Sequence, residues 1–256
     1  MPVGFEVANH IATITLNRPE AMNSLDPEAS ADLRRIWAEV ASNPDIRVSI
    51  LTGTGPKAFC TGTDMKATPP ATECMAAIYL RDGLPIAPAM KMWKPIICAI
   101  NGYAVGGGLE MALACDLRIA SSNAKFGLTE VKVASLAGIN GTQMLPRAIP
   151  QAVAMKMLLT GEMISAEEAL RFGLVSDVVA PEELMKLATS LAEKIAAAAP
   201  LSVQAAKQAA VVGLDMPAEH GMMFAHLLWG VLRDTDDRKE GFKAFAEKRS
   251  PQYRGS

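Results

Sequence analysis

The sequence lacks long hydrophobic runs and a strong charge of either sign. None of its apolar runs reaches the roughly 18 residues that a membrane-spanning helix needs. The formal net charge is −2 at pH 7, from 25 basic and 27 acidic residues, so no global basic field attracts nucleic acid. The N-terminal residues MPVGFEVANH lack the charged and apolar regions of a secretory signal. From these absences we predict a soluble cytoplasmic protein with no membrane and no nucleic-acid partner.

Cysteine is also scarce. The sequence contains four cysteines, scattered without the spacing of metal ligands: Cys60, Cys74, Cys98 and Cys115. Because Cys98 lies in the apolar run PIICAI, we predict reduced, buried thiols and no metal site. Hydrophobic residues, by contrast, make up 50% of the 256 residues, enough for the core of one large domain or of a domain with a small appendage.

Strand and helix patterns alternate through the first part of the chain. Short β-rich runs at Phe5–Val7 and Ile11–Leu16 predict a hairpin, and Asp26 followed by Pro27 predicts the start of a helix. Further strand and helix patterns follow in turn up to Val179. This alternation favours right-handed crossovers and parallel pairing, so the predicted fold class is α/β.

The later part of the chain is predicted to be helical. Ser165 and Glu168 have the spacing of a capping box, and helices with breaks between them follow from Pro200 onward. We therefore predict an α/β core at 1–199 and a C-terminal helical region at 200–256. Between the early strands, a mobile segment is predicted at Lys66–Thr72 and a proline-interrupted helix at Glu73–Met92.

One stretch, Asn101–Asp116, joins a strand end, three consecutive glycines and a helix start. Glycines permit positive φ and let a ligand approach backbone N–H groups, and the first turn of a helix leaves such groups unpaired and partly positive. Glu110 lies in that turn before a run of apolar residues, so we expect it at the edge of a buried helix. An anion site with a proton carrier and an ordinary turn with a dipole-complementing acid both fit this pattern. A dinucleotide site does not, because Met111 occupies the third glycine position of G-x-G-x-x-G.

Three segments in this order carry a resemblance to a known family: AFCTGTDMK, NGYAVGGGLEMALACD and FGLTE. With LNRPEAMNSL, MLLTGEMISAEEALRFGLVSDVV and DDRKEGFKAFAEKRSPQY, the similarity covers nearly the whole chain. The sequence resembles the crotonase superfamily, whose best known members are the enoyl-CoA hydratases. The resemblance implies a crotonase-like spiral of ββα units, followed by a C-terminal helical region that helps to build trimers, often paired into hexamers.

The resemblance also implies an active site for CoA thioesters. The backbone N–H groups of Thr63 and Gly107 would stabilise an enolate, and the amide of Gly138 would hold a water. Glu110 would activate this water for attack at the β-carbon, and Glu130 would supply the proton to the α-carbon. Four further residues would contact CoA: Thr61, Lys66, Trp229 and Lys248. No metal or redox cofactor is implied, since coenzyme A is part of the substrate.

Two carboxylates distinguish a hydratase-like site from the family's simplest isomerases, which keep only the one at Glu130. The leading hypothesis is therefore an enoyl-CoA hydratase, a lyase that reversibly adds water to a trans-2-enoyl-CoA to give a 3-hydroxyacyl-CoA, working as a homotrimer or homohexamer. The sequence departs from the family pattern at Glu20, at Thr129 and in the turn AGINGTQML at 137–145. Two alternatives stay open: another crotonase-type lyase or isomerase acting on a branched, cyclic or carnitine-linked acyl-CoA, and a non-catalytic acyl-CoA-binding protein.

Other residues are interpreted as structural. Asp116 and Arg118 are predicted to form an ion pair beneath the site. Six methionines are assigned to gaps in the core or to an adaptable acyl pocket: Met90, Met92, Met155, Met157, Met222 and Met223.

Overall fold

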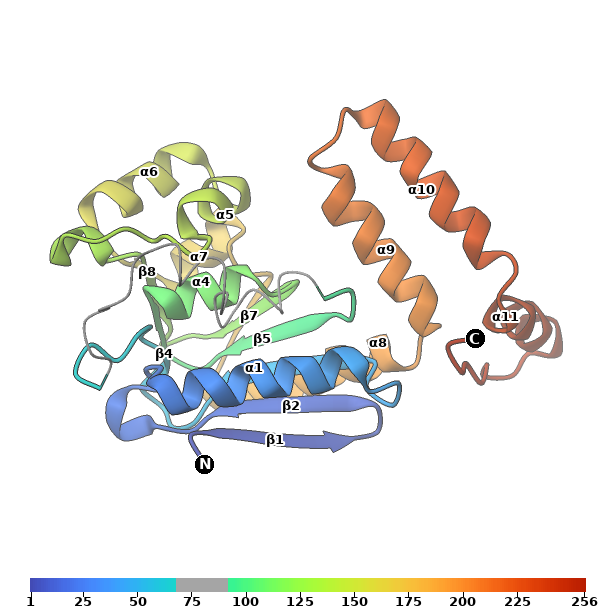
Figure 1. Cartoon of the computed structure of the whole chain (residues 1–256), viewed down its shortest axis with the longest axis horizontal. Coiled ribbons are helices and arrows are strands. Elements are labelled where there is room, and N and C mark those ends of the chain that lie inside the picture. The colour runs from blue at the N-terminus through green and yellow to red at the C-terminus, as the bar shows by residue number, and fades with distance from the viewer. Residues whose placement is uncertain (68–91) are drawn as a thin grey trace.

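The structure is a computed structural model that describes residues 1–67 and 92–256. It shows a layered α/β body with three C-terminal helices extending from one side (Figure 1). The segments predicted to be mobile at Lys66–Thr72 and helical at Glu73–Met92 fall almost entirely outside the described residues.

The chain begins with the predicted hairpin. Strands β1 (Val3–Ala8) and β2 (Ile11–Leu16) pair antiparallel. The two turn residues, Asn9 and His10, have φ angles of 51° and 66°, the left-handed conformation that two-residue hairpin turns require. The prediction of a hairpin here is confirmed.

Helix α1 (Pro27–Ser42) also begins as predicted. The side chain of Asp26 accepts a hydrogen bond of 2.7 Å from the backbone N–H of Ala29, and Pro27 occupies the first helical position. Its apolar face is buried through Leu33, Ile36, Trp37 and Val40. Because these residues recur at helical spacing, α1 packs against the sheet along one continuous stripe.

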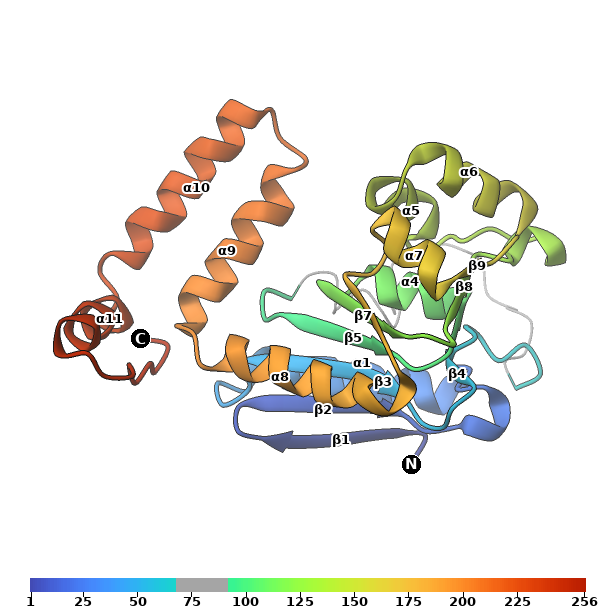
Figure 2. The ribbon, with the colours of Figure 1, turned by 180° about the vertical axis from the view of Figure 1, so that it is seen from behind.

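The larger sheet has six strands in the order β1-β2-β3-β5-β7-β10. Its later members are β3 (Val48–Gly53), β5 (Ile96–Ile100), β7 (Leu117–Ser121) and β10 (Asp177–Val179), and all pairings from β2 onward are parallel. Helix α1 covers one face and α8 (Leu184–Ala196) covers the other (Figures 1 and 2). Burial on both faces explains why β5 reads as the uninterrupted apolar run IICAI.

A second sheet has the order β4-β6-β8-β9. Its strands are β4 (Ala58–Cys60), β6 (Tyr103–Val105), β8 (Lys125–Gly127) and β9 (Ile164–Ser165), of which the first three are parallel. The chain therefore alternates between the sheets, with β3, β5 and β7 in the larger sheet each followed by one strand of the smaller sheet. This repeat is the predicted spiral of ββα units, so the expected fold class is confirmed.

Short helices connect the strands and cover the smaller sheet. The α-helices are α4 (Gly107–Leu113), α5 (Gly141–Ala148), α6 (Gln151–Thr160) and α7 (Ala166–Phe172). The 3-10 helices are η1 (Pro19–Ala21), η3 (Glu130–Val133) and η4 (Pro181–Glu183). The predicted capping box is present at the start of α7, where Ser165 and Glu168 exchange side-chain and backbone bonds.

The C-terminal region consists of α9 (Pro200–Gly213), α10 (Ala218–Leu232) and α11 (Asp236–Glu247). Helices α9 and α10 form a hairpin that extends away from the core in both views (Figures 1 and 2). Lys207 on α9 ties this region to the core through an ion pair of 2.8 Å with Asp116. The predicted pair between Asp116 and Arg118 is therefore wrong. Arg118 instead donates to the backbone carbonyls of Leu174 and Cys115.

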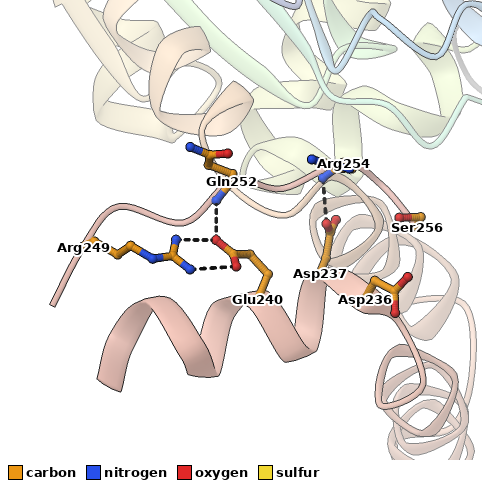
Figure 3. A pocket seen from close by; sticks show the side chains of 7 residues that line it. All are labelled: Asp236, Asp237, Glu240, Arg249, Gln252, Arg254 and Ser256. Carbon is orange, nitrogen blue, oxygen red and sulfur yellow. Dashed lines mark hydrogen bonds and ion pairs between the residues drawn. The ribbon is translucent and has the colours of Figure 1, made fainter. Parts of the chain in front are cut away.

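The last residues fold back over α11. Asp237 accepts hydrogen bonds from the backbone N–H groups of Arg254 and Gly255, and Arg249 forms two bonds to the carboxylate of Glu240 (Figure 3). These groups line an open pocket of about 400 Å³. Because the chain itself supplies partners for both carboxylates, the contacts clamp the tail onto the helix.

The burial of the cysteine and methionine side chains agrees only in part with the prediction. Cys60, Cys98 and Cys115 are buried free thiols, as predicted, whereas Cys74 lies outside the described residues. Met92 and Met157 are buried, and Met90 lies outside the described residues. The assignment of Met155, Met222 and Met223 to gaps in the core is wrong, because all three are exposed. No single described helix is long and apolar enough to cross a membrane. The helices Pro181–Ala196 and Pro200–Gly213 are long and apolar enough only when taken together, and a bend of 106° separates them.

Candidate active site

Two loops meet at the end of the smaller sheet. One follows β4 and contains Gly62, and the other follows β6 and contains Gly106 and Gly107. Because β4 and β6 pair in parallel, both loops emerge at the same sheet edge. A β-carbon on Gly62 would stand 2.8 Å from the amide nitrogen of Gly107. Gly62 and Gly106 also have φ angles of 84° and 56°, so the contact depends on glycine for both space and conformation.

The backbone N–H groups of Thr63 and Gly107 lie at this contact. The backbone N–H of Leu25 donates to the carbonyl of Gly62 at 2.8 Å, and the carbonyl of Leu25 accepts from the N–H of Asp64 at 2.9 Å. This bridge turns the N–H of Thr63 away from Leu25. Gly107 is the first residue of α4, so its N–H has no acceptor within the helix. Within residues 1–67 and 92–256, neither N–H donates to another group of the chain. Two such N–H donors side by side can both donate to one negatively charged oxygen.

Glu110 is held from the opposite side by the start of α5. Its side chain is only 3% exposed, as its predicted place on a buried helix requires. The oxygen Oε1 accepts three backbone N–H bonds, each of 2.9 Å, from Ile139, Asn140 and Gly141. These donors lie at the start of α5, where backbone N–H groups lack partners within the helix and favour an anion. The carboxylate therefore has a position defined through Oε1.

Glu130 has a different environment. A β-carbon on Gly106 would lie 3.3 Å from its Oε1, so this carboxyl group reaches the start of α4. Its Oε2 is buried and has no hydrogen-bond partner among the described residues. Burial raises the pKa of Glu130, and the negative charge of Glu110 raises it further. A raised pKa keeps a carboxyl group protonated to higher pH, so Glu130 can act as a proton donor.

The other predicted residues differ in their relation to this group. The carbonyl of Thr61 lies 3.9 Å from the place of a Gly106 β-carbon, so Thr61 borders the site. Gly138 is exposed and directly precedes the turn that holds Glu110, and Lys66 is exposed in the loop after Thr63. Trp229, 48% exposed on α10, lies in the helical extension, away from α4 (Figures 1 and 2). Lys248 follows α11 in that same extension, so the single chain does not bring these two residues to the glutamates.

Two supporting residues have no role in the sequence-based prediction. Arg18 donates to the carboxylate of Asp64 at 2.9 Å and pairs with Asp26 at 3.2 Å, which fixes the loop that carries Thr63. Asn140 donates its side-chain N–H to the backbone carbonyl of Glu110 at 2.9 Å. The only signal for Asn140 in the sequence is that it belongs to the 137–145 turn, which departs from the family pattern.

The sequence matches the Enoyl-CoA hydratase/isomerase family over residues 6–256. The chain belongs to the enoyl-CoA hydratase/isomerase family. The (E)-benzylidenesuccinyl-CoA hydratase of Thauera aromatica is 78% identical over 256 residues, covering 100% of both chains. The short-chain-enoyl-CoA hydratase of Clostridium acetobutylicum is 36% identical over 245 residues, covering 95% of this chain and 94% of the relative.

Solved structures of this family have the same fold. The crystal structure of an enoyl-CoA hydratase from Bacillus anthracis matches with a TM-score of 0.91 and 37% identity, covering 100% of both chains. The crotonase resemblance found in the sequence is thereby confirmed. Membership of this enoyl-CoA hydratase/isomerase family supports hydratase-type chemistry on an acyl-CoA thioester.

Proposed function

We propose that the protein is an enoyl-CoA hydratase that adds water reversibly to a trans-2-enoyl-CoA. The observation that carries this proposal is the contrast between two carboxyl groups beside one pair of free amides. Glu110 has an oxygen held by three N–H donors, whereas Glu130 has a raised pKa and a buried oxygen with no hydrogen-bond partner in the described part of the chain. Hydration needs one group that accepts a proton and another that donates one, and this contrast provides both.

The proposed reaction assigns one step to each group. The thioester oxygen accepts hydrogen bonds from Thr63 and Gly107, which stabilise the enolate; one such donor typically contributes about 3 kcal/mol. Glu110 takes a proton from the water while the water oxygen forms a bond to the β-carbon. Glu130 gives its proton to the α-carbon. The product is a 3-hydroxyacyl-CoA, and proton exchange returns both carboxyl groups to their starting states.

We further propose that the acyl group carries an aromatic ring and a second carboxylate, as in (E)-benzylidenesuccinyl-CoA. Support comes from the 78% identity to the hydratase named for that thioester. Exposed apolar residues also follow Glu130 directly, namely Val131, Val133 and Leu136. They offer apolar surface to a ring attached to the β-carbon.

The test is a substrate panel with the purified chain. We would follow loss of enoyl-thioester absorbance with crotonyl-CoA and (E)-benzylidenesuccinyl-CoA, and identify the hydrated product by mass spectrometry. A higher kcat/KM for the aromatic thioester supports the full proposal. Turnover of crotonyl-CoA alone would keep the hydratase but reject the aromatic substrate, and tight binding without turnover would indicate an acyl-CoA-binding protein.

The proposed active form is a homotrimer or homohexamer. The helical extension exposes Leu227 and Phe245 together with Met222 and Met223, an apolar surface that another copy of the chain would cover. In that arrangement Trp229 and Lys248 would reach the CoA of a neighbouring subunit. Light scattering on the purified protein is expected to give about three or six times the chain mass of 27.2 kDa; a monomer would contradict this part of the proposal.

A further inference from the structure

Asn140 contacts Glu110 at two places. Its backbone N–H donates to Oε1 of the carboxylate, and its side-chain N–H donates to the backbone carbonyl of the same glutamate, both at 2.9 Å. Asn140 is itself buried. The residue directly before α5 thus holds both the side chain and the main chain of one residue of α4.

This use of the side chain is unusual for the position. Asn140 precedes the first residue of α5, where an asparagine side chain ordinarily accepts a bond from its own helix. Here the side chain makes no such cap, although the backbone carbonyl of Asn140 accepts from Gln143 and Met144. The amide group is directed to Glu110 instead of to α5.

The neighbouring glycine shows how closely the turn approaches. A β-carbon on Gly141 would lie 2.8 Å from both Ala137 and Leu128 and 3.2 Å from Cγ of Glu110. A small outward movement of the turn would lengthen all three bonds to Oε1 together. A contact that resists this movement would therefore control where the carboxylate points.

We propose that Asn140 is a positioning residue for Glu110, and that its side-chain bond holds the 139–141 turn against α4 so that Oε2 faces the reacting water. This inference rests on the proposed hydratase function. It assigns to Asn140 an effect on turnover that passes through Glu110 and leaves thioester binding largely unchanged.

The experiment compares Asn140→Asp and Asn140→Gly with the control Gln143→Ala, an exposed position on α5, the helix that follows Asn140. The aspartate keeps the shape but replaces the donor, and the glycine removes the side chain. We expect kcat on the thioester that the parent turns over to fall about tenfold or more in N140D and less in N140G, with KM changed less than about twofold. The control should match the parent.

A double-mutant cycle separates positioning from a general structural effect. In a Glu110→Gln background, N140D should reduce the residual rate by less than about twofold, because the group it positions is already absent. An equal loss in both backgrounds, or a loss confined to KM, would overturn the proposal. If N140D does not fold, the same cycle is run with N140G.

Hydrogen exchange gives a measurement that needs no turnover. The amides of residues 139–141 should exchange faster in N140D than in the parent, and at the parent rate in Q143A. If the parent hydrates no thioester, the proposed function fails, while the exchange data still decide the structural half of the inference. Unchanged exchange at residues 139–141 in N140D would refute the proposal that the Asn140 side chain holds this turn in place.

Discussion

Gly62 and Gly107 belong to successive ββα units, yet a β-carbon on the first would lie 2.8 Å from the amide nitrogen of the second. The parallel pairing of β4 with β6 produces this contact. It places the N–H of Thr63 beside the N–H at the start of α4, so that one oxygen can accept from both. The proposed enolate site is therefore made of backbone, and its geometry depends on the absence of side chains.

Replacing Gly62 with alanine should damage this site. The new methyl group would meet the Gly107 nitrogen, and φ of 84° is unfavourable for alanine. We expect kcat/KM to fall about 100-fold or more, as for loss of an oxyanion donor. Gly173→Ala is a matched control, because Gly173 has φ of 80° but no atom within 4 Å of the added carbon. Similar activity losses in the two variants would attribute the effect to backbone strain alone.

Removing either of the two carboxylates proposed to be catalytic should lower turnover without preventing binding. We expect Glu110→Gln and Glu130→Gln each to reduce kcat about 10²- to 10⁴-fold, because each loses one proton-transfer role. Glu167→Gln removes an exposed carboxylate on α7 and serves as the control. Steady-state kinetics with calorimetric binding of a product thioester make the measurement. Parent-like kcat in both glutamine variants would contradict the assigned roles.

The raised pKa of Glu130 predicts a pH-dependent change in stability. Because burial raises this pKa, the folded chain holds the proton more tightly than the unfolded chain. That contribution is complete below the ordinary glutamate pKa and is lost as pH rises through the raised value. Glu130→Gln should therefore unfold at a higher temperature than the parent at pH 8, with the difference shrinking toward pH of about 4. Thermal unfolding of both proteins across this pH range is the measurement. A difference in unfolding temperature that grows on acidification would contradict a raised pKa of Glu130.

The ion pair between Lys207 and Asp116 should stabilise the helical extension. These side chains are only 12% and 23% exposed, and Asp116 also accepts from the N–H of Ile96. We expect Lys207→Met to cost about 1–2 kcal/mol and to speed proteolysis within α9, because the carboxylate loses its charged partner. Lys186→Met breaks a 2.6 Å pair with Glu183 whose side chains are 73% and 50% exposed. This control should cost less than about 0.5 kcal/mol, and equal effects would mean that burial is irrelevant here.

Features set by neighbouring residues could be predicted from the sequence. The hairpin at Asn9 and His10, the cap at Asp26 and the box between Ser165 and Glu168 all match the structure. In each case the interacting groups are a few residues apart, so backbone conformation and short-range bonds decide the outcome. The resemblance supplied the family, while the glycine run indicated a helix start with unpaired backbone N–H groups.

Only the tertiary structure decided which distant groups became partners. The sequence by itself determined that a glycine turn and a helix with Glu110 in its first turn would follow the apolar strand that ends at Ile100. It did not determine that Asn140 would hold Glu110 or that Asp116 would pair with Lys207 rather than Arg118. Nor did it determine that Oε2 of Glu130 would be buried with no hydrogen-bond partner among the described residues. Each of these side chains can bond to many groups, and burial and competing donors select among them only after the sheets and helices have packed.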